Sequence, residues 1–236
     1  MTGAKADKNI STLRECKFFA QVSAKGLKRA ASAGSFVTYK PGEEIVSHQN
    51  KTDTVFFLLS GRARVVAYSA AGRAIDYGRI QAGTIFGEFA AVDGRARSAS
   101  VETVQLARVL RLSAGEFWAL LEGEPAFARQ LVIHLVAMAR SLTERVYEFS
   151  TLTVSNRIQA ELLRLIREST SAGGQAILAP PPKHAEIAAR VSTHREAVTR
   201  EFSRLTELGV IERKRHGLIV KDLARLEKMV HEATGE

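Results

Sequence analysis

Turn-forming residues recur at nearly regular intervals through the first half of the chain and then stop. Between positions 36 and 112 most of them stand about 10 to 12 residues apart, at Pro41-Gly42, Gly61, Gly72, Gly83 and Asp93-Gly94. The segments between them are rich in β-forming residues, notably 55–59, 65–68 and 106–112. This rhythm is typical of a small β-barrel or sandwich. We expect one helix before it, over residues 12–33, with Leu27 and Ala30 on its apolar face.

After Gly123 the pattern becomes that of a long helix. Pro125 suits a first helical turn, and about 25 residues without glycine or proline follow it. Apolar residues there follow an a/d heptad with Arg145 at the remaining a position: Leu131, Leu135, Met138, Leu142 and Phe149. A narrow stripe of this kind indicates a two-stranded seam between two copies of the chain. The alternative is a helix that packs on its own domain.

The last third of the chain predicts a winged helix-turn-helix. Residues 150–155 indicate a hinge, and Thr153 or Ser155 is expected to cap the next helix. That helix ends at 171–174 and carries four apolar residues at helical spacing: Ile158, Leu162, Leu163 and Ile166. The chain then continues with a helix over 184–190 and a turn at 191–192. A second helix runs from Thr193 to a C-cap at Gly209, and a hairpin over 211–220 follows it. The buried residues of the two helices are expected to be Ile187, Ala188, Val198, Phe202 and Leu205, with Leu208 alongside.

Together these patterns predict an α+β fold in three parts. We expect a jelly-roll-like β-roll over residues 1–123, a dimerisation helix and hinge over 124–152, and a winged helix-turn-helix domain over 153–236.

Residues 86–101 combine the groups that a cyclic phosphate and a sugar require. Gly87 lets the backbone approach an anion, and the next residues, including Phe89 and Ala90, form a short helical turn whose N–H groups point at it. Glu88 suits a ribose hydroxyl, Arg97 offers a fork of donors to a phosphate, and Ser98 adds a hydroxyl. The turn at Asp93-Gly94 folds the two halves together.

The second helix of the helix-turn-helix carries side chains suited to reading base edges. Its exposed face is expected to present Arg195, Glu196, Thr199 and Arg200, with His194 just before it. Arginine can fork onto guanine, and glutamate can accept from cytosine, in the major groove. Lys214, in the basic hairpin tip at 213–216, suits DNA phosphates. Two alternatives remain open: Glu196 forms a capping box with Thr193, or pairs with Arg200 in solvent.

With both motifs on one chain, the sequence resembles the cyclic AMP receptor protein family of bacterial transcription regulators. The likeness rests on Gly87, Glu88, Arg97 and Ser98, and on the pattern Arg-Glu-x-x-x-Arg at 195–200. The resemblance implies a homodimer, controlled by cyclic AMP, that reads double-stranded DNA at half-sites of TGTGA type. It also implies RNA polymerase as a partner and a purine contact from the long helix, for which Thr143 is the best match. Cyclic GMP remains open as the ligand.

Charge and composition exclude other classes more than they select one. The net charge of +9 suggests a polyanionic partner, but it does not locate the site, because residues from Thr151 onward hold 14 basic against 11 acidic residues. A single cysteine, Cys16, and six scattered histidines argue against a metal centre, and no nucleophile–base set indicates an enzyme. No apolar run approaches membrane-spanning length, so we expect a cytoplasmic protein without a membrane partner.

A different class of function also fits the two motifs. A regulatory subunit would bind the nucleotide and use its C-terminal domain to contact another protein. The arginines of the second helix favour DNA over that alternative. Target promoters, and whether transcription rises or falls, do not follow from the sequence.

Overall fold

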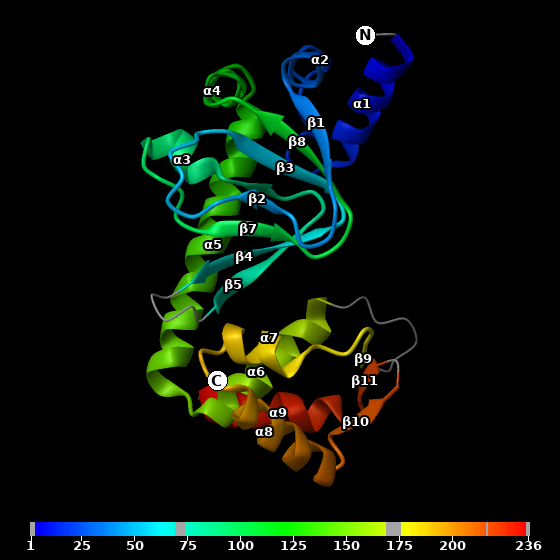
Figure 1. Ribbon diagram of the computed structural model, residues 1–236, viewed down its shortest axis with the longest axis vertical. Helices are drawn as coiled ribbons and strands as arrows, with labels where there is room; N and C mark the ends of the chain where they lie inside the picture. The colour runs from blue at the N-terminus through cyan, green and yellow to red at the C-terminus, as the bar shows by residue number, and fades with distance from the viewer. Residues whose placement is uncertain (1–2, 69–73, 169–175, 216, 235–236) are drawn as a thin grey trace. The chain divides into compact units, whose positions relative to one another are not determined.

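A computed structural model describes residues 3–68, 74–168, 176–215 and 217–234. The chain forms two compact units, and the division between them falls inside the long helix, between Met138 and Ala139. Figure 1 follows the chain from the strand-rich first unit to the helical second unit. Each unit is described by itself below.

Two helices, rather than one, precede the β-structure. Helix α1 spans Gly3–Glu15 and α2 spans Ala24–Ala33, so the predicted single helix over 12–33 is wrong. The chain turns between them through backbone hydrogen bonds from Phe19 N to Cys16 O and from Val22 N to Phe19 O. These turns bury Cys16 and Phe19 in the core, and Ser23 then caps α2 by accepting a hydrogen bond from Gly26 N at 3.0 Å. Leu27 and Ala30 are buried, as the sequence predicts.

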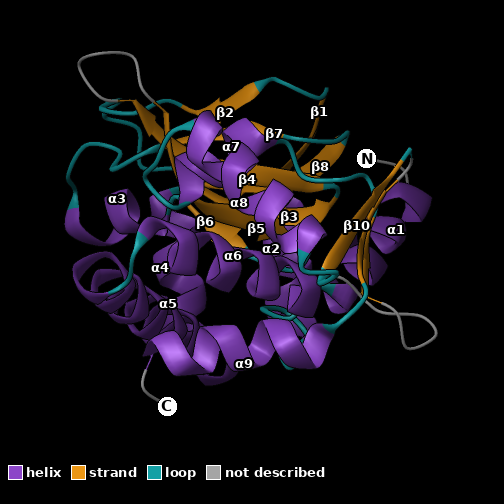
Figure 2. Cartoon of the chain, turned by 90° about the horizontal axis from the view of Figure 1, so that it is seen from below, coloured by secondary structure: helices purple, strands orange, loops and turns teal. Residues whose placement is uncertain are grey.

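In the described part of the first unit, eight strands form two four-stranded sheets, which confirms the predicted β-roll. The first sheet has the order β1 (Ser35–Tyr39), β8 (Ala107–Leu112), β3 (Val55–Ser60) and β6 (Ile85–Phe86). The second has the order β2 (Glu44–Val46), β7 (Ser100–Thr103), β4 (Arg62–Tyr68) and β5 (Ala74–Gln81). The central pairings of the two sheets, β3–β8 and β4–β7, are both antiparallel. Figure 2 distinguishes these strands from the helices.

The predicted turns fall where the backbone needs glycine. Gly42, Gly61, Gly83 and Gly94 all have positive φ, between +68° and +90°. At Gly61 a Cβ would also lie 2.2 Å from the carbonyl oxygen of Leu106. A side chain is therefore excluded there both by the backbone conformation and by this contact. The predicted turn at Gly72 lies outside the described residues.

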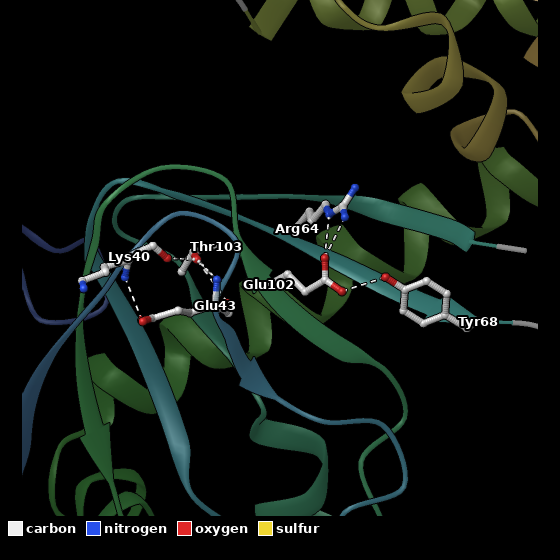
Figure 3. Close-up of polar contacts among 6 residues, drawn as sticks. All are labelled: Lys40, Glu43, Arg64, Tyr68, Glu102 and Thr103. Carbon is white, nitrogen blue, oxygen red and sulfur yellow. Dashed lines mark hydrogen bonds and ion pairs between the residues drawn. The ribbon is translucent and has the colours of Figure 1, made fainter. Parts of the chain in front are cut away.

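Polar contacts fix the register of the second sheet (Figure 3). Glu102 on β7 lies directly opposite Arg64 on β4 and accepts two hydrogen bonds from it, at 2.7 and 3.1 Å. Tyr68 donates a third to the other oxygen of Glu102, at 2.8 Å. The next residue, Thr103 at the end of β7, uses its hydroxyl to accept from Glu43 N and to donate to the carbonyl of Lys40. A one-residue slip of β7 would break both sets of contacts.

A cluster of aromatic rings fills the core of the first unit. Phe19, Phe57, Phe117 and Phe127 are fully buried, and their ring centroids lie 4.8 to 6.0 Å apart in the contacting pairs. Phe117 comes from α4 (Ala114–Gly123), and Phe127 comes from the start of α5 (Pro125–Thr151). Helix α5 begins at Pro125, as predicted, and α4 is a helix that the sequence analysis did not anticipate.

The second unit is the predicted winged helix-turn-helix, with two further elements. Its order is α6 (Val154–Glu168), β9 (Ala176–Leu178), α7 (His184–Arg190), α8 (Arg195–Glu207), β10 (Ile211–Lys214), β11 (Gly217–Val220) and α9 (Leu223–Thr234). Strand β9 pairs with β11 and makes the wing three-stranded; neither β9 nor α9 was predicted. Thr153 caps α6 by accepting a hydrogen bond from Asn156 N at 3.3 Å. The predicted helix end at 171–174, and residue 216 at the hairpin tip, lie outside the described residues.

The core of this unit confirms the predicted buried faces. Ile158, Leu162, Ile187, Val198 and Leu205 are each 0% exposed. After α8 the chain leaves the helix through Gly209, whose φ is +70°. Hydrogen bonds from Gly209 N to Thr206 O and from Val210 N to Leu205 O close the last turn.

Candidate functional site

Gly87 brings the backbone against the arginine that the sequence singles out. It follows strand β6 with φ +78° and caps α3 (Glu88–Asp93), the short helix expected after it. A Cβ at this position would lie 2.8 Å from Nη1 of Arg97 and 3.1 Å from the ring of Phe56. Both the conformation and the close approach therefore require glycine.

The Arg97 side chain is buried and held at three points. Nη1 donates to Gly87 O at 2.6 Å, Nη2 donates to Thr54 O at 2.7 Å, and Nε donates to the Thr52 hydroxyl at 3.2 Å. The residue is only 4% exposed. Three of the five guanidinium N–H groups are used in these contacts, so one on each terminal nitrogen remains for a ligand.

The charge of Arg97 is largely uncompensated. Burial lowers the pKa of its guanidinium, and the more distant carboxylates of Asp53 and Glu88 only partly oppose this effect. Within the described part of the chain, no carboxylate forms an ion pair with it. A buried cation with hydrogen bonds only to neutral oxygens favours an incoming anion.

One loop also fixes the backbone of Arg97. Arg97 N donates to Asn50 O at 2.9 Å, and Gln49 N donates to Arg97 O at 3.0 Å. The loop of residues 47–54 therefore forms hydrogen bonds with both the backbone and the side chain of Arg97. Thr52 and Thr54 are functional candidates that the sequence analysis missed, because nothing local relates them to a residue some 45 positions away.

Glu88 is buried beside a histidine from α5. It is 4% exposed, and its Oε1 lies 3.7 Å from Nε2 of His134, an ion pair only if the imidazole is protonated. That Nε2 atom is buried without a hydrogen-bond partner. The ring of Phe18 packs edge-on against His134, with centroids 5.7 Å apart. His134 was not predicted as a site residue.

The remaining residues predicted for this site differ in burial. Ala90 is buried, Phe89 is 43% exposed, and Ser98 is exposed beside the buried Arg97. The Asp93-Gly94 turn forms as predicted, and the Asp93 carboxylate accepts from Arg95 N at 2.9 Å. Trp118 of α4 anchors α3 by donating to Ala91 O at 3.0 Å.

Thr143 lies on α5 within the second unit. It is exposed, and its hydroxyl donates to the carbonyl of Ala139 at 3.0 Å. The structure does not test its predicted contact with a purine, which stays a prediction.

The apolar residues of α5 are divided between two faces. Leu131 is buried in the core of the first unit and is not available to a seam, and Leu135 is half-buried against that core. Leu142 and Phe149 of the predicted seam are 49% and 40% exposed, so the seam itself stays a prediction. The structure also exposes a neighbouring stripe, offset by one residue from the predicted one, made of Val132, Val136, Ala139, Thr143 and Val146. Val132, Val136 and Val146 are 59%, 48% and 64% exposed. We call these five residues the α5 stripe.

The helix-turn-helix is rigidly built. Ser192 takes a positive φ of +51° in the turn between α7 and α8. Beneath it, Glu161 of α6 forms a buried ion pair with Arg190 of α7. Gln159 of α6 donates to the buried Glu201 of α8 at 2.6 Å. These contacts fix α8 relative to α6 and α7.

The outer face of α8 presents the predicted side chains to solvent. His194, Arg195, Glu196, Thr199 and Arg200 are all exposed. Helix α8 begins at Arg195 with His194 as its N-cap, rather than at Thr193 as predicted. Among the described residues, Glu196 and Arg200 do not pair with each other. Both remain available to a ligand.

Lys214 on the wing is exposed but not isolated. Its Nζ lies 3.8 Å from Glu212, and Lys221 reaches the same carboxylate at 3.2 Å. The two lysines lower the pKa of Glu212, mainly through the hydrogen bond from Lys221. The carboxylate therefore reduces the positive potential of the wing at Lys214.

Within the described ranges, no group of three potential metal-binding side chains comes together. None of the described helices is long and apolar enough to cross a membrane.

Comparison with known proteins identifies both units. Residues 36–124 match the family model of the cyclic nucleotide-binding domain, and residues 156–229 match that of the Crp-like helix-turn-helix domain. The fold and site thus define a transcription regulator with a cyclic nucleotide-binding domain.

Individual relatives narrow this class. A cyclic AMP receptor protein from Thermus thermophilus is 28% identical over 194 residues, covering 81% of this chain and 86% of its own. The solved structure of a CRP/FNR-family transcriptional regulator, also from Thermus thermophilus, is 25% identical, has a TM-score of 0.70, and is matched over 84% of this chain and 100% of its own. FixK2 from Bradyrhizobium japonicum, at 19% identity, shares the fold with a TM-score of 0.72 over 83% of this chain and 96% of its own. The chain belongs to the CRP/FNR family of transcription regulators.

Proposed function

We propose that the chain is a homodimeric regulator whose DNA affinity is controlled by cyclic AMP. It reads a pseudo-palindromic operator with half-sites of TGTGA type. In this proposal residues 1–123 bind the nucleotide, 124–152 hold the dimer together and 153–236 bind DNA. Transcription requires RNA polymerase, which we take as a further partner, and the protein works in the cytoplasm.

The observation that carries the nucleotide proposal is the uncompensated charge of Arg97. In the proposal its two remaining N–H groups donate hydrogen bonds to the cyclic phosphate. The N–H groups of Phe89 and Ala90 and the hydroxyl of Ser98 donate to the same phosphate. Glu88 accepts from a ribose hydroxyl, and Thr143 contacts the purine. The match to a cyclic AMP receptor protein supports cyclic AMP over cyclic GMP.

The exposed apolar side chains of α5 support the dimer. The α5 stripe follows the alternating spacing of four and three residues that a two-stranded coiled coil requires. Thr143 belongs to this stripe, so a nucleotide that contacts Thr143 reaches the dimer seam. Ligand binding then favours one arrangement of the two subunits through its differential affinity.

The exposed charges of α8 support DNA rather than protein as the partner of the second unit. Arg195 and Arg200 read guanines, Glu196 reads a cytosine, and Thr199 and His194 complete the face. Half-site centres in such an operator lie about one helical turn, roughly 34 Å, apart.

Calorimetric titration of the full chain with each nucleotide tests the proposal. We expect one class of site per subunit with higher affinity for cyclic AMP than for cyclic GMP. Thr143→Ala should narrow the difference between the two nucleotides, whereas Ser141→Ala, a nearby exposed hydroxyl on α5, should leave it unchanged. Absence of heat with both nucleotides would contradict the proposal.

A further inference from the structure

His184, at the start of α7, holds a side chain of the DNA-reading helix. Its Nδ1 lies 2.8 Å from the hydroxyl oxygen of Thr199 on α8. The ring also packs edge-on against Phe202, with centroids 5.0 Å apart and an interplanar angle of 65°. His184 therefore contacts α8 on both its exposed and its buried side.

The hydrogen bonds of Thr199 decide where the imidazole carries its proton. The Thr199 hydroxyl donates to the carbonyl of Arg195 at 3.0 Å, and a carbonyl can only accept. Its single proton is therefore used, and it accepts from His184. We assign the proton of the neutral ring to Nδ1 for this reason. Within the described residues Nε2 has no hydrogen bond, so it is the atom left for a ligand.

Two arginines act on the same ring. Burial lowers the pKa of His184, and the charges of Arg213 on β10 and Arg195 on α8 lower it further. Along its own segment the charged neighbours are Lys183 and Glu186, and Glu161 of α6 forms ion pairs with Arg190 and Arg164. Burial and both arginines therefore favour the neutral form of the imidazole.

We infer that His184 is a positioning residue for Thr199 and takes up a proton when the domain binds a DNA phosphate through Nε2. The inference rests on the proposed DNA-binding function. A phosphate offsets the repulsion from Arg195 and Arg213, so the charged imidazole becomes favourable in the complex. Nε2 then carries a proton that it can donate to a phosphate oxygen.

The direction of the pH dependence follows from linkage. The pKa of His184 is low in the free protein and higher in the complex, so the proton is taken up on binding. DNA affinity should therefore be greatest at low pH and fall as pH rises through the pKa of the complex. One proton corresponds to at most about a tenfold change in affinity per pH unit.

The test measures DNA binding by fluorescence anisotropy between about pH 5.5 and 8. The probe is a duplex with two inverted TGTGA half-sites, bound by the full chain with saturating cyclic AMP. His184→Asn keeps an N–H donor where Nδ1 stands but cannot titrate. This variant should bind DNA at pH 8 within about threefold of the wild-type affinity. The slope of its log affinity against pH should be smaller than that of the wild type by up to one proton. His184→Ala should lose affinity at every pH, because Thr199 is no longer held.

Two other histidines serve as controls. His231 is exposed on α9, and His231→Asn should leave the pH slope unchanged. His194→Asn tests the contribution of the histidine at the start of α8. A wild-type slope in His184→Asn, or a slope removed by His194→Asn instead, would overturn the inference. If wild-type protein binds no better to this duplex than to a scrambled one at any pH, the proposed function fails, and the slope on any duplex it does bind still tests His184.

Discussion

The two candidate sites use positive charge in opposite ways. In the first unit Arg97 is buried. The loop of residues 47–54 forms hydrogen bonds with the backbone and the side chain of this arginine. In the second unit Arg195 and Arg200 extend from α8 into solvent. The rigid parts there lie beneath the helix, in the buried pairs Glu161–Arg190 and Gln159–Glu201.

This difference corresponds to two kinds of recognition. A buried cation with two free N–H groups suits one small anion, because it is oriented before the ligand arrives. Exposed arginines on a fixed helix suit a long polyanion, where many contacts each contribute a little and salt weakens all of them. Substitutions around Arg97 should therefore weaken the binding of one small ligand, whereas substitutions on α8 should each remove one of many contacts with DNA.

The largest expected effect comes from the helix that spans both units. Val136→Glu places a charge in the α5 stripe, and burying it in a dimer seam without a partner costs several kcal/mol. We expect monomers in analytical ultracentrifugation and DNA affinity at least about 100-fold lower, because two half-sites are no longer held together. Ala137→Glu, also exposed but about 100° around the helix, is the matched control. Dimers in both variants would place the interface elsewhere.

Arg97→Leu tests the buried cation. Loss of a charge-assisted hydrogen bond costs about 1.5–3 kcal/mol, which weakens nucleotide binding about tenfold or more. Calorimetry with cyclic AMP measures the effect, and circular dichroism checks that the fold survives. The control is Arg95→Leu, whose side chain is 86% exposed and should bind as wild type does. Equal loss in the two variants would mean that general surface charge, not Arg97, attracts the ligand.

Arg200→Ala tests base reading by an exposed cation. We expect DNA affinity to fall by about 1–3 kcal/mol and discrimination to relax at one position in each half-site. Gel shifts against single-base changes of the operator measure both. Lys214→Ala should weaken all sequences alike and flatten the salt slope. If Arg200→Ala also weakens all sequences alike, Arg200 contacts phosphate rather than a base.

The smallest effect concerns how Arg97 is held. Thr52→Val removes the hydroxyl that accepts from Nε, at a cost of about 0.5–1.5 kcal/mol in nucleotide binding. Thr54→Val is the matched control, because Thr54 holds Arg97 through its backbone carbonyl, which valine keeps. We expect calorimetry to detect a weaker affinity only in Thr52→Val. Similar affinities in both would show that the backbone contacts alone orient the guanidinium.

The sequence predicts best where the signal is local. The span of α7 and the turn after it follow from helical spacing and short-range breakers, and the structure confirms them. The closure of α8 follows from a glycine that can take positive φ. The glycine turns of the β-roll were predicted for the same reason. Each of these signals lies within a few residues of the feature that it determines.

Contacts across the fold could not be predicted. Thr52 and Thr54 reach Arg97, and His134 reaches Glu88, only through the folding of distant segments, which leaves no local trace in the sequence. The break between α1 and α2 was missed because buried aromatic residues there resemble a helical face. The burial of Leu131 and the half-burial of Leu135 were also missed, because periodicity does not say which partner an apolar stripe faces.

The central claim is that the ligand of the first unit controls DNA binding by the second. The direct test is the affinity of the full chain for the TGTGA duplex, measured with and without cyclic AMP in wild type and in Arg97→Leu. We predict that cyclic AMP raises the affinity of the wild type about 10-fold or more, in the range of typical allosteric coupling, and leaves Arg97→Leu unchanged at the same concentration. Equal wild-type affinity with and without cyclic AMP, or a full response in Arg97→Leu, would contradict the account.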